Sequence, residues 1–221
     1  MDLATAWAGK SFDWVLRRAA LKGNEQLLMA LLQQVCLLLT GIIARVDTEH
    51  KNKNKNSSSN DNAKTTMNLV DLCRRAAETC KSSADFVKNI YDHKNVAARE
   101  TLIYLCGGSP SAVAHIAESS CPNKPFFLPG LNVLLCYCGF GARVSLAKQL
   151  LCLGANDIDA AMQAASSNVH DDVQIVDFFL SQGPSRWSIR RSYILAETRG
   201  KLQVLQWLHK SNKDPFKSYS S

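Results

Sequence analysis

Acidic residues form the simplest groups in this sequence that could do chemistry. Two pairs of carboxylates could take part in general acid–base catalysis, Asp157 with Asp159 and Asp171 with Asp172. Each pair stands where a helix is expected to begin, and a carboxylate at such a position caps free backbone N–H groups. The sequence has no glycine-rich phosphate loop, no His-Glu-x-x-His and no Gly-x-Ser-x-Gly motif. We therefore expect no enzymatic activity and no cofactor.

The eight cysteines raise the question of a metal site. Four zinc ligands could come from a set in the middle of the chain, made up of Cys106, His115, Cys121, Cys136 and Cys138. Paired Cys-x-x-Cys knuckles are absent, and most of the cysteines lie in apolar runs. Burial as small apolar side chains explains them, so the sequence predicts reduced, free thiols and no bound metal.

Tryptophan and arginine side chains are candidates for binding rather than for catalysis, because they dominate the hot spots of protein interfaces. Trp187 stands in the connection before the last helical segment, where we expect it to be exposed. The predicted binding patch is Trp187 with three nearby arginines, Arg186, Arg190 and Arg191. The alternative is a solvated basic turn that binds nothing.

A recurring seven-residue pattern defines the elements that must position these side chains. Its reference form is Ser145–Leu151, SLAKQLL, in which polar and apolar residues follow helical spacing. Related segments are Glu25–Leu31, Asp85–Tyr91, Ser111–Ala117, Gln174–Leu180 and Gln203–His209. From Asp85 onward the segments begin 26, 34, 29 and 29 residues apart, whereas 60 residues separate Glu25 from Asp85. A period of about 30 residues is typical of stacked helical repeats.

This recurrence predicts an all-α fold, a helical-repeat solenoid of about six helix-turn-helix units. Residues 1–46 would form the N-terminal unit, which continues into an extended apolar helix. Residues 47–67 would be a flexible polar insertion, because KNKNKNSSSNDNAKTT cannot bury enough apolar surface to offset the entropy of ordering it. The repeats would resume over residues 68–213, and residues 214–221 would form a frayed tail.

Three segments resemble the second half of the ankyrin repeat, namely AALKGNEQLLMALLQQ, ARVSLAKQLLCLGAN and ETRGKLQVLQWLHK. No unit has the Thr-Pro-Leu-His motif that opens a standard ankyrin repeat. Such degenerate arrays resemble the divergent ankyrin-repeat proteins of large DNA viruses and protists, including the multigene families of African swine fever virus. The resemblance implies an ankyrin-like scaffold that binds a partner protein through a concave surface. For a viral chain, the partner would belong to host signalling or defence.

Arg18 and Arg75 gain a role from this resemblance. Each precedes a pair of small alanines within a repeated Arg-Arg-Ala-Ala sequence. In an ankyrin-like stack this position faces the concave groove, so both guanidinium groups would point to one surface. We therefore expect an acidic or carboxylate-bearing partner for that groove.

The charge of the chain leaves nucleic-acid binding as an alternative. Twenty-six Lys and Arg against nineteen Asp and Glu give a net charge of +7. Lysines of the polar insertion could reach phosphates, namely Lys51, Lys53, Lys55 and Lys64. No aromatic residue lies between them to stack on bases, so we rank this function second.

Membrane attachment is the third possibility. Residues 27–46 are nearly long enough to span a bilayer, but Gln33, Gln34 and Arg45 interrupt the apolar run. The first residues, MDLATAWAGKSFDW, lack the basic-then-apolar layout of a secretory signal. We expect a monomeric protein of the cytoplasm or nucleus that is not secreted.

Overall fold

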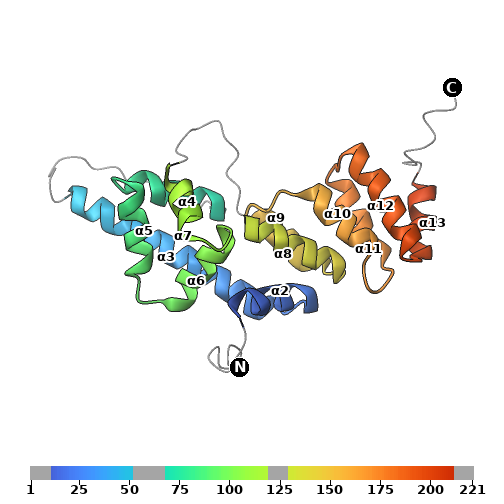
Figure 1. Cartoon of the computed structure of the whole chain (residues 1–221), viewed down its shortest axis with the longest axis horizontal. Coiled ribbons are helices and arrows are strands. Elements are labelled where there is room, and N and C mark those ends of the chain that lie inside the picture. The colour runs from blue at the N-terminus through green and yellow to red at the C-terminus, as the bar shows by residue number, and fades with distance from the viewer. Residues whose placement is uncertain (1–10, 52–67, 119–128, 212–221) are drawn as a thin grey trace. The chain divides into compact units, whose positions relative to one another are not determined.

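A computed structural model of the chain describes residues 11–51, 68–118 and 129–211. Within these residues it has twelve helices, α2 to α13, and no strand, which confirms the all-α prediction (Figure 1). The chain divides into two compact units. Unit 1 comprises residues 1–28 and 131–221, and unit 2 comprises residues 29–130.

Unit 1 is built from helix pairs. They are α2 (Phe12–Lys22) with the start of α3 (Glu25–Lys51), α8 (Pro129–Phe140) with α9 (Val144–Cys152), α10 (Ile158–Ser166) with α11 (Val173–Ser181), and α12 (Arg186–Thr198) with α13 (Leu202–Lys210). In the last three pairs the first helices begin at residues 129, 158 and 186, and the second helices at 144, 173 and 202. The pairs therefore recur every 28 or 29 residues.

The four aspartates considered as catalytic pairs hold helix starts instead. Asp157 caps its own helix α10, where its Oδ1 accepts a hydrogen bond from Ala160 N at 3.0 Å. Asp172 caps α11 in the same way, accepting from Gln174 N at 2.8 Å. The capping interpretation of these two residues is confirmed.

Asp159 and Asp171 act on the next pair along the chain. The Asp159 carboxylate accepts hydrogen bonds from the backbone N–H and the hydroxyl of Ser185, the N-cap of α12, at 2.7 and 2.6 Å. Asp171, with φ of 53°, accepts from the backbone N–H groups of Gln203 and Val204 at the start of α13. Each carboxylate thus fixes the start of a helix in the following pair.

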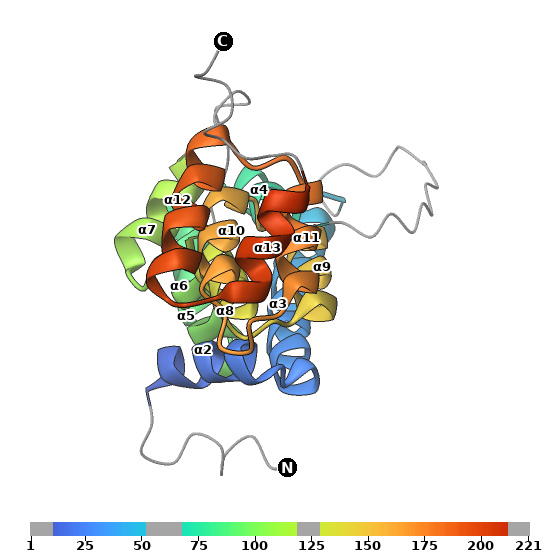
Figure 2. The same ribbon diagram turned by 90° about the vertical axis from the view of Figure 1, so that its right-hand side faces the viewer.

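Small side chains allow α10 and α12 to pack closely. The buried side of α12 consists of Ser188, Ser192 and Ala196. The Ser188 hydroxyl donates to the carbonyl oxygen of Asp159 at 2.8 Å, which brings the two helices together near their N-termini. Figure 2 looks onto α12 and α13, and no other described helix lies in front of them.

The N-terminal pair packs against α8 and α9, although more than 100 residues separate them in the sequence. Arg143 Nε donates to the carbonyl oxygen of Leu21 at 3.4 Å, and Gln149 Nε2 donates to Glu25 Oε2 at 3.3 Å. A Cβ on Gly141 would collide with the same Leu21 carbonyl. Within unit 1, the first helix pair therefore lies beside the α8–α9 pair, which is not its neighbour in the sequence.

Unit 2 contains the rest of α3 with α4 (Leu69–Thr79), α5 (Ser83–Tyr91), α6 (Val96–Leu105) and α7 (Pro110–Glu118). Helix α7 packs against α4, α5 and α6. Helix α3 ends at Lys51, so residues 47–51 are helical and do not belong to a flexible insertion. The remainder of the predicted insertion, residues 52–67, and the whole of the predicted tail, residues 214–221, lie outside the described residues.

Part of α3 has the composition of a membrane span. Residues Glu25–Thr48 have a mean hydropathy of 2.2, and 44% of this window is buried inside the protein. The buried positions follow helical spacing and include Leu28, Leu31, Leu32 and Val35. The core helix of a soluble protein has the same properties, so this helix is weak evidence for a membrane.

Candidate interaction surface

Trp187 lies in the first turn of α12 and is 65% exposed. The sequence prediction of exposure is confirmed, but its placement in a connection is wrong. The reason lies two residues earlier, because the Ser185 hydroxyl accepts a hydrogen bond from Ser188 N and starts the helix there. Trp187 is therefore held on a helix, on the side opposite Ser188, Ser192 and Ala196.

Further exposed apolar side chains accompany Trp187. Ile194, seven residues later on α12, is 42% exposed, and Leu202 at the start of α13 is 66% exposed. Each lies on the side of its helix away from the buried residues of that helix. Sequence reasoning missed both. The sequence could have indicated Ile194 through its spacing from Trp187, since residues seven positions apart lie on the same side of a helix. That spacing is informative only once residues 186–198 are known to form one helix.

The predicted arginines surround these side chains. Arg186 and Arg191 are exposed and Arg190 is half-buried. We call Trp187, Ile194 and Leu202, together with Arg186, Arg190 and Arg191, the terminal face. Tyr193 of α12 and His209 of α13 join the two helices through a hydrogen bond between the Tyr hydroxyl and Nε2, with the rings edge to face at a centroid distance of 5.1 Å. The terminal face is therefore carried by two helices that are tied together.

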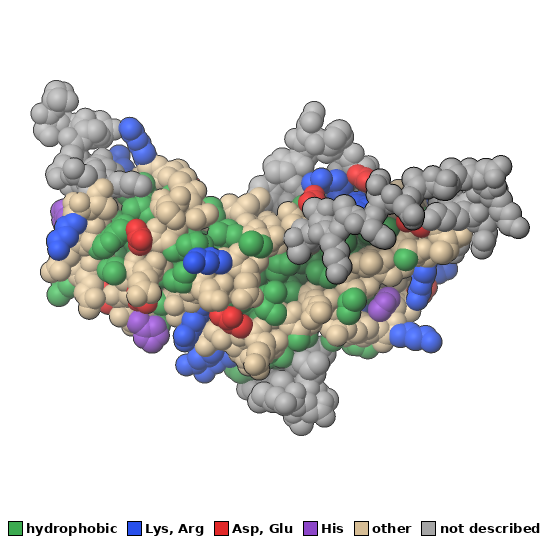
Figure 3. All heavy atoms as spheres, turned by 180° about the vertical axis from the view of Figure 1, so that it is seen from behind, with side chains coloured by type: hydrophobic (Ala, Val, Ile, Leu, Met, Phe, Trp, Pro, Cys, Tyr) green, Lys and Arg blue, Asp and Glu red, His purple; other side chains and the backbone are tan. Residues whose placement is uncertain are grey.

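Charge is unevenly distributed between the last two pairs. Residues 184–210 contain six Lys and Arg and a single acidic residue, Glu197, whereas residues 157–183 contain five Asp and no Lys or Arg. From behind, hydrophobic side chains reach the surface over the C-terminal helix pairs, with Lys and Arg side chains near them (Figure 3). Exposed apolar groups and cationic groups therefore share the last helix pair.

Helix α2 carries the same Trp-x-x-Arg-Arg sequence in a different environment. Arg17 is paired with Asp13 at 2.7 Å and lies 5.8 Å from the ring centre of Tyr137. Arg18 lies over the ring of Trp14, which is 46% exposed, at 5.9 Å from its centre. Both guanidinium groups of α2 thus contact side chains of their own unit.

Arg18 and Arg75 fall in different compact units of the chain. Arg18 belongs to α2 of unit 1, whereas Arg75 belongs to α4 of unit 2, and both are exposed. A shared carboxylate-binding groove for these two arginines therefore stays a prediction.

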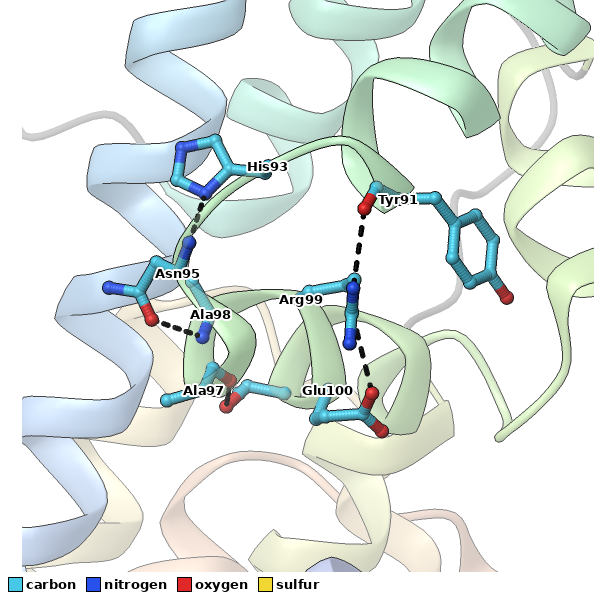
Figure 4. A network of polar contacts seen from close by, with 8 residues as sticks. Tyr91, His93, Asn95, Ala97, Ala98, Arg99 and Glu100 are labelled. Carbon is cyan, nitrogen blue, oxygen red and sulfur yellow. Dashed lines mark hydrogen bonds and ion pairs between the residues drawn. The ribbon is translucent and has the colours of Figure 1, made fainter. Parts of the chain in front are cut away.

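A polar cluster connects α5 to α6 in unit 2 (Figure 4). Asn95 caps α6 by accepting from Ala98 N at 3.1 Å, and its Nδ2 donates to Gln34 Oε1 of α3 at 2.5 Å. Arg99 Nη1 donates to the carbonyl oxygen of Tyr91 at 3.2 Å. These bonds fix the start of α6 against its neighbours, which is a structural role.

The described zinc ligands considered from the sequence are divided between the two compact units. Cys106 follows α6 in unit 2, Cys136 and Cys138 lie on α8, and Cys121 lies outside the described residues. Among the described residues no three His, Cys, Asp or Glu side chains are placed to hold a metal ion. The seven described cysteines are free thiols.

Burial makes several of these thiols weak acids. It raises the pKa of Cys106 from 9.0 to about 12 and that of Cys136 to about 11, and it raises the pKa of Cys73 and Cys138 as well. The cause in each case is that the thiolate would lose its hydration in an apolar environment. Nucleophilic chemistry by these cysteines is therefore disfavoured at neutral pH.

We expect the free energy of unfolding to fall as the pH rises from 9 toward 12. Above pH 9 the unfolded state gains stability by ionising Cys106, whereas the folded state keeps this thiol protonated up to about pH 12. The loss from Cys106 should be roughly 1 kcal/mol at pH 10. Urea unfolding at pH 8 and pH 10 measures this loss. The free energy of unfolding should fall more between the two pH values for wild type than for Cys106→Ala.

The exposed Cys152 supplies the control for this measurement. Cys152→Ala shows what a cysteine-to-alanine substitution does to the measured stability when the side chain lies at the surface. Equal pH dependence in wild type and Cys106→Ala would contradict the expectation. Titration of lysines and tyrosines is common to all three proteins and cancels in the comparison.

The chemistry available on the terminal face is that of binding. Guanidinium groups donate paired hydrogen bonds to carboxylates, and indole and aliphatic side chains bury apolar area. Comparison with protein-family models, with curated proteins and with solved structures found no significant match to this chain.

Proposed function

We propose that this protein is a non-enzymatic scaffold that binds a partner protein, built from helix-pair repeats of an ankyrin-like kind. The regular spacing of the last three helix pairs supports such a repeat. So do the polar contacts between them. Asn132 of α8 accepts from the backbone N–H groups of Asn156 and Asp157, just as Asp159 holds the start of α12. Equivalent contacts at similar separations are typical of stacked repeats.

The terminal face is the observation that carries the binding function. Trp187, Ile194 and Leu202 are large apolar side chains that stay exposed on one helix pair. Grouped exposure of this kind marks interaction sites, whereas single exposed apolar residues are common on any surface. Tryptophan and arginine are also the residues most enriched at interface hot spots.

The proposal extends to the remaining properties expected from the sequence. The protein acts as a monomer in the cytoplasm or nucleus and needs no cofactor. In a virus, the natural partner would be a host protein of signalling or defence, and the scaffold would compete for it or recruit it. Nucleic-acid binding ranks second, supported by the six Lys and Arg residues of the last pair.

Affinity capture followed by mass spectrometry tests the function. The full chain and Trp187→Ala are used as baits in extracts of the native source, with Val169→Ala as the matched control, since Val169 is exposed but lies outside the terminal face. Proteins recovered with wild type and Val169→Ala should be missing with Trp187→Ala. Identical recovery by all three baits would contradict a binding role for this face.

A further inference from the structure

We infer that the terminal face recognises an acidic amphipathic helix, that is, a helix whose apolar stripe is flanked by carboxylates. This inference rests on the proposed function and specifies the chemistry of the partner segment. The argument for it has two parts. The exposed apolar side chains of the terminal face need an apolar stripe on the partner, and its cations need anionic groups on both sides of that stripe.

The apolar half of the argument is geometric. Trp187 and Ile194 stand seven residues apart on one helix, about 10 Å along its axis. Leu202 adds a third apolar group from the neighbouring helix α13. A helix that crosses two adjacent helices places anchors at i, i+3 or i+4 and i+7 at this same spacing. The contact between Tyr193 and His209 keeps the two supporting helices together, which limits the reorganisation that binding requires.

The electrostatic half of the argument concerns cations that the protein itself leaves available. No ion pair within the described residues involves Arg186 or Arg191, and both side chains are exposed. The nearest acidic pair of helices does not neutralise them. Four of its five aspartates hold helix starts, among them Asp159, bonded to Ser185, and Asp171, bonded to the start of α13. The positive charges of Arg186 and Arg191 therefore remain for a partner.

Other occupants fit these observations less well. A second copy of the chain joined through the same face would bring two sets of arginines together, which like-charge repulsion disfavours. Nucleic acid would satisfy the arginines, but it offers no apolar surface for Ile194 and Leu202, and Trp187 alone could stack on a base. An acidic amphipathic helix satisfies both kinds of side chain.

The test uses the full chain and three synthetic peptides of about 15 residues, the length at which an isolated helix becomes marginally stable. All three carry the same leucine stripe, and their flanking positions are Glu, Gln or Lys. By fluorescence anisotropy we expect the Glu peptide to bind at least about tenfold more tightly than the Gln peptide, and the Lys peptide not to bind. Equal affinity for the Glu and Lys peptides, or no binding of the Glu peptide, overturns the inference.

Variants of the chain assign the binding to the terminal face. Trp187→Ala should weaken binding of the Glu peptide at least about tenfold. The double reversal Arg186→Glu/Arg191→Glu should reverse the preference, so that the Lys peptide binds best. Trp14→Ala is the matched control, because Trp14 also precedes an arginine by four residues and is exposed on a helix. A loss with Trp14→Ala equal to that with Trp187→Ala overturns the assignment. Far-ultraviolet circular dichroism checks that every variant keeps its helix content.

The remaining occupants are tested with the same proteins. Duplex DNA or anionic vesicles that bind the wild type more tightly than the Glu peptide and lose affinity in Trp187→Ala would overturn the inference, as would dimerisation abolished by Trp187→Ala in sedimentation. If Trp187→Ala loses its captured partner while the Glu peptide fails to bind, the scaffold function stands and the acidic helix is wrong. If neither experiment responds to Trp187→Ala, both are wrong.

Discussion

Gly141→Ala should lower the stability of unit 1 by about 3 kcal/mol, the upper end of what overpacking a close contact costs. Gly141 is buried in the turn between α8 and α9, and a Cβ there would overlap the Leu21 carbonyl oxygen at the end of α2. The obstacle is backbone, so no rotamer change relieves it. Helix α2 must therefore move away from α8, which also weakens the hydrogen bond from Arg143 to Leu21.

Urea unfolding and hydrogen exchange measure this effect. Amide exchange should accelerate first in α2, because the substitution acts on the contact that holds it. Gly41→Ala is the matched control, since a Cβ on this glycine of α3 would meet no atom within 4 Å. It should raise stability by roughly 0.5–1 kcal/mol, the helix-propensity difference between the two residues. Destabilisation of similar size by both substitutions would contradict the proposed contact.

Phe179→Ala should destabilise unit 1 by about 3–5 kcal/mol, as expected for truncation of a fully buried phenylalanine. Phe179 of α11 has no exposed surface, and its ring edge lies 3.4 Å from the position a Cβ on Gly139 would take. Gly139 in turn packs against the backbone of α10. A Cβ on Gly139 would lie 2.8 Å from the carbonyl oxygen of Ala161. The ring therefore fills the space where α8, α10 and α11 meet, and its loss leaves a cavity shared by two helix pairs.

The adjacent Phe178→Ala provides the comparison. Phe178 is only partly buried, and it has Lys148 Nζ at 5.8 Å from its ring centre. Both substitutions remove the contact between the two rings, whose centres are 5.1 Å apart, so that contribution cancels. In urea unfolding Phe179→Ala should lose at least about twice as much stability as Phe178→Ala. Equal losses would show that burial does not decide the difference.

The helical pattern in the sequence predicted the elements well. All six signature segments lie inside helices, for example Ser145–Leu151 in α9 and Gln174–Leu180 in α11. Apolar spacing is enough to locate such helices, because each must bury one side whatever its neighbour is. Apolar spacing did not predict that the exposed Trp187 lies within a helix. Its helix begins with a local hydrogen bond to the hydroxyl of Ser185 rather than with an apolar stripe.

The neighbours of each helix pair could not be predicted in this way. The N-terminal pair lies beside α8 because glycine at position 141 lets the two backbones approach. A repeat period shows that units are equivalent, but it does not show which units touch when a long segment intervenes. Asp159 and Asp171 illustrate the same limit, since a carboxylate near a helix start is expected to cap its own helix, whereas these two hold helices of the next pair.

The bonds made by Asn132, Asp159 and Asp171 all run in one direction along the chain. In each case the acceptor is made by the ribosome before the helix start that it holds. Each new pair of the C-terminal part can therefore add to a pair already present as it emerges, without waiting for later residues. Helix α2, in contrast, is synthesised before the helix that it packs against. Its partner α8 follows more than 100 residues later, a delay on the order of ten seconds at typical rates of synthesis, during which the apolar side of α2 lacks that partner.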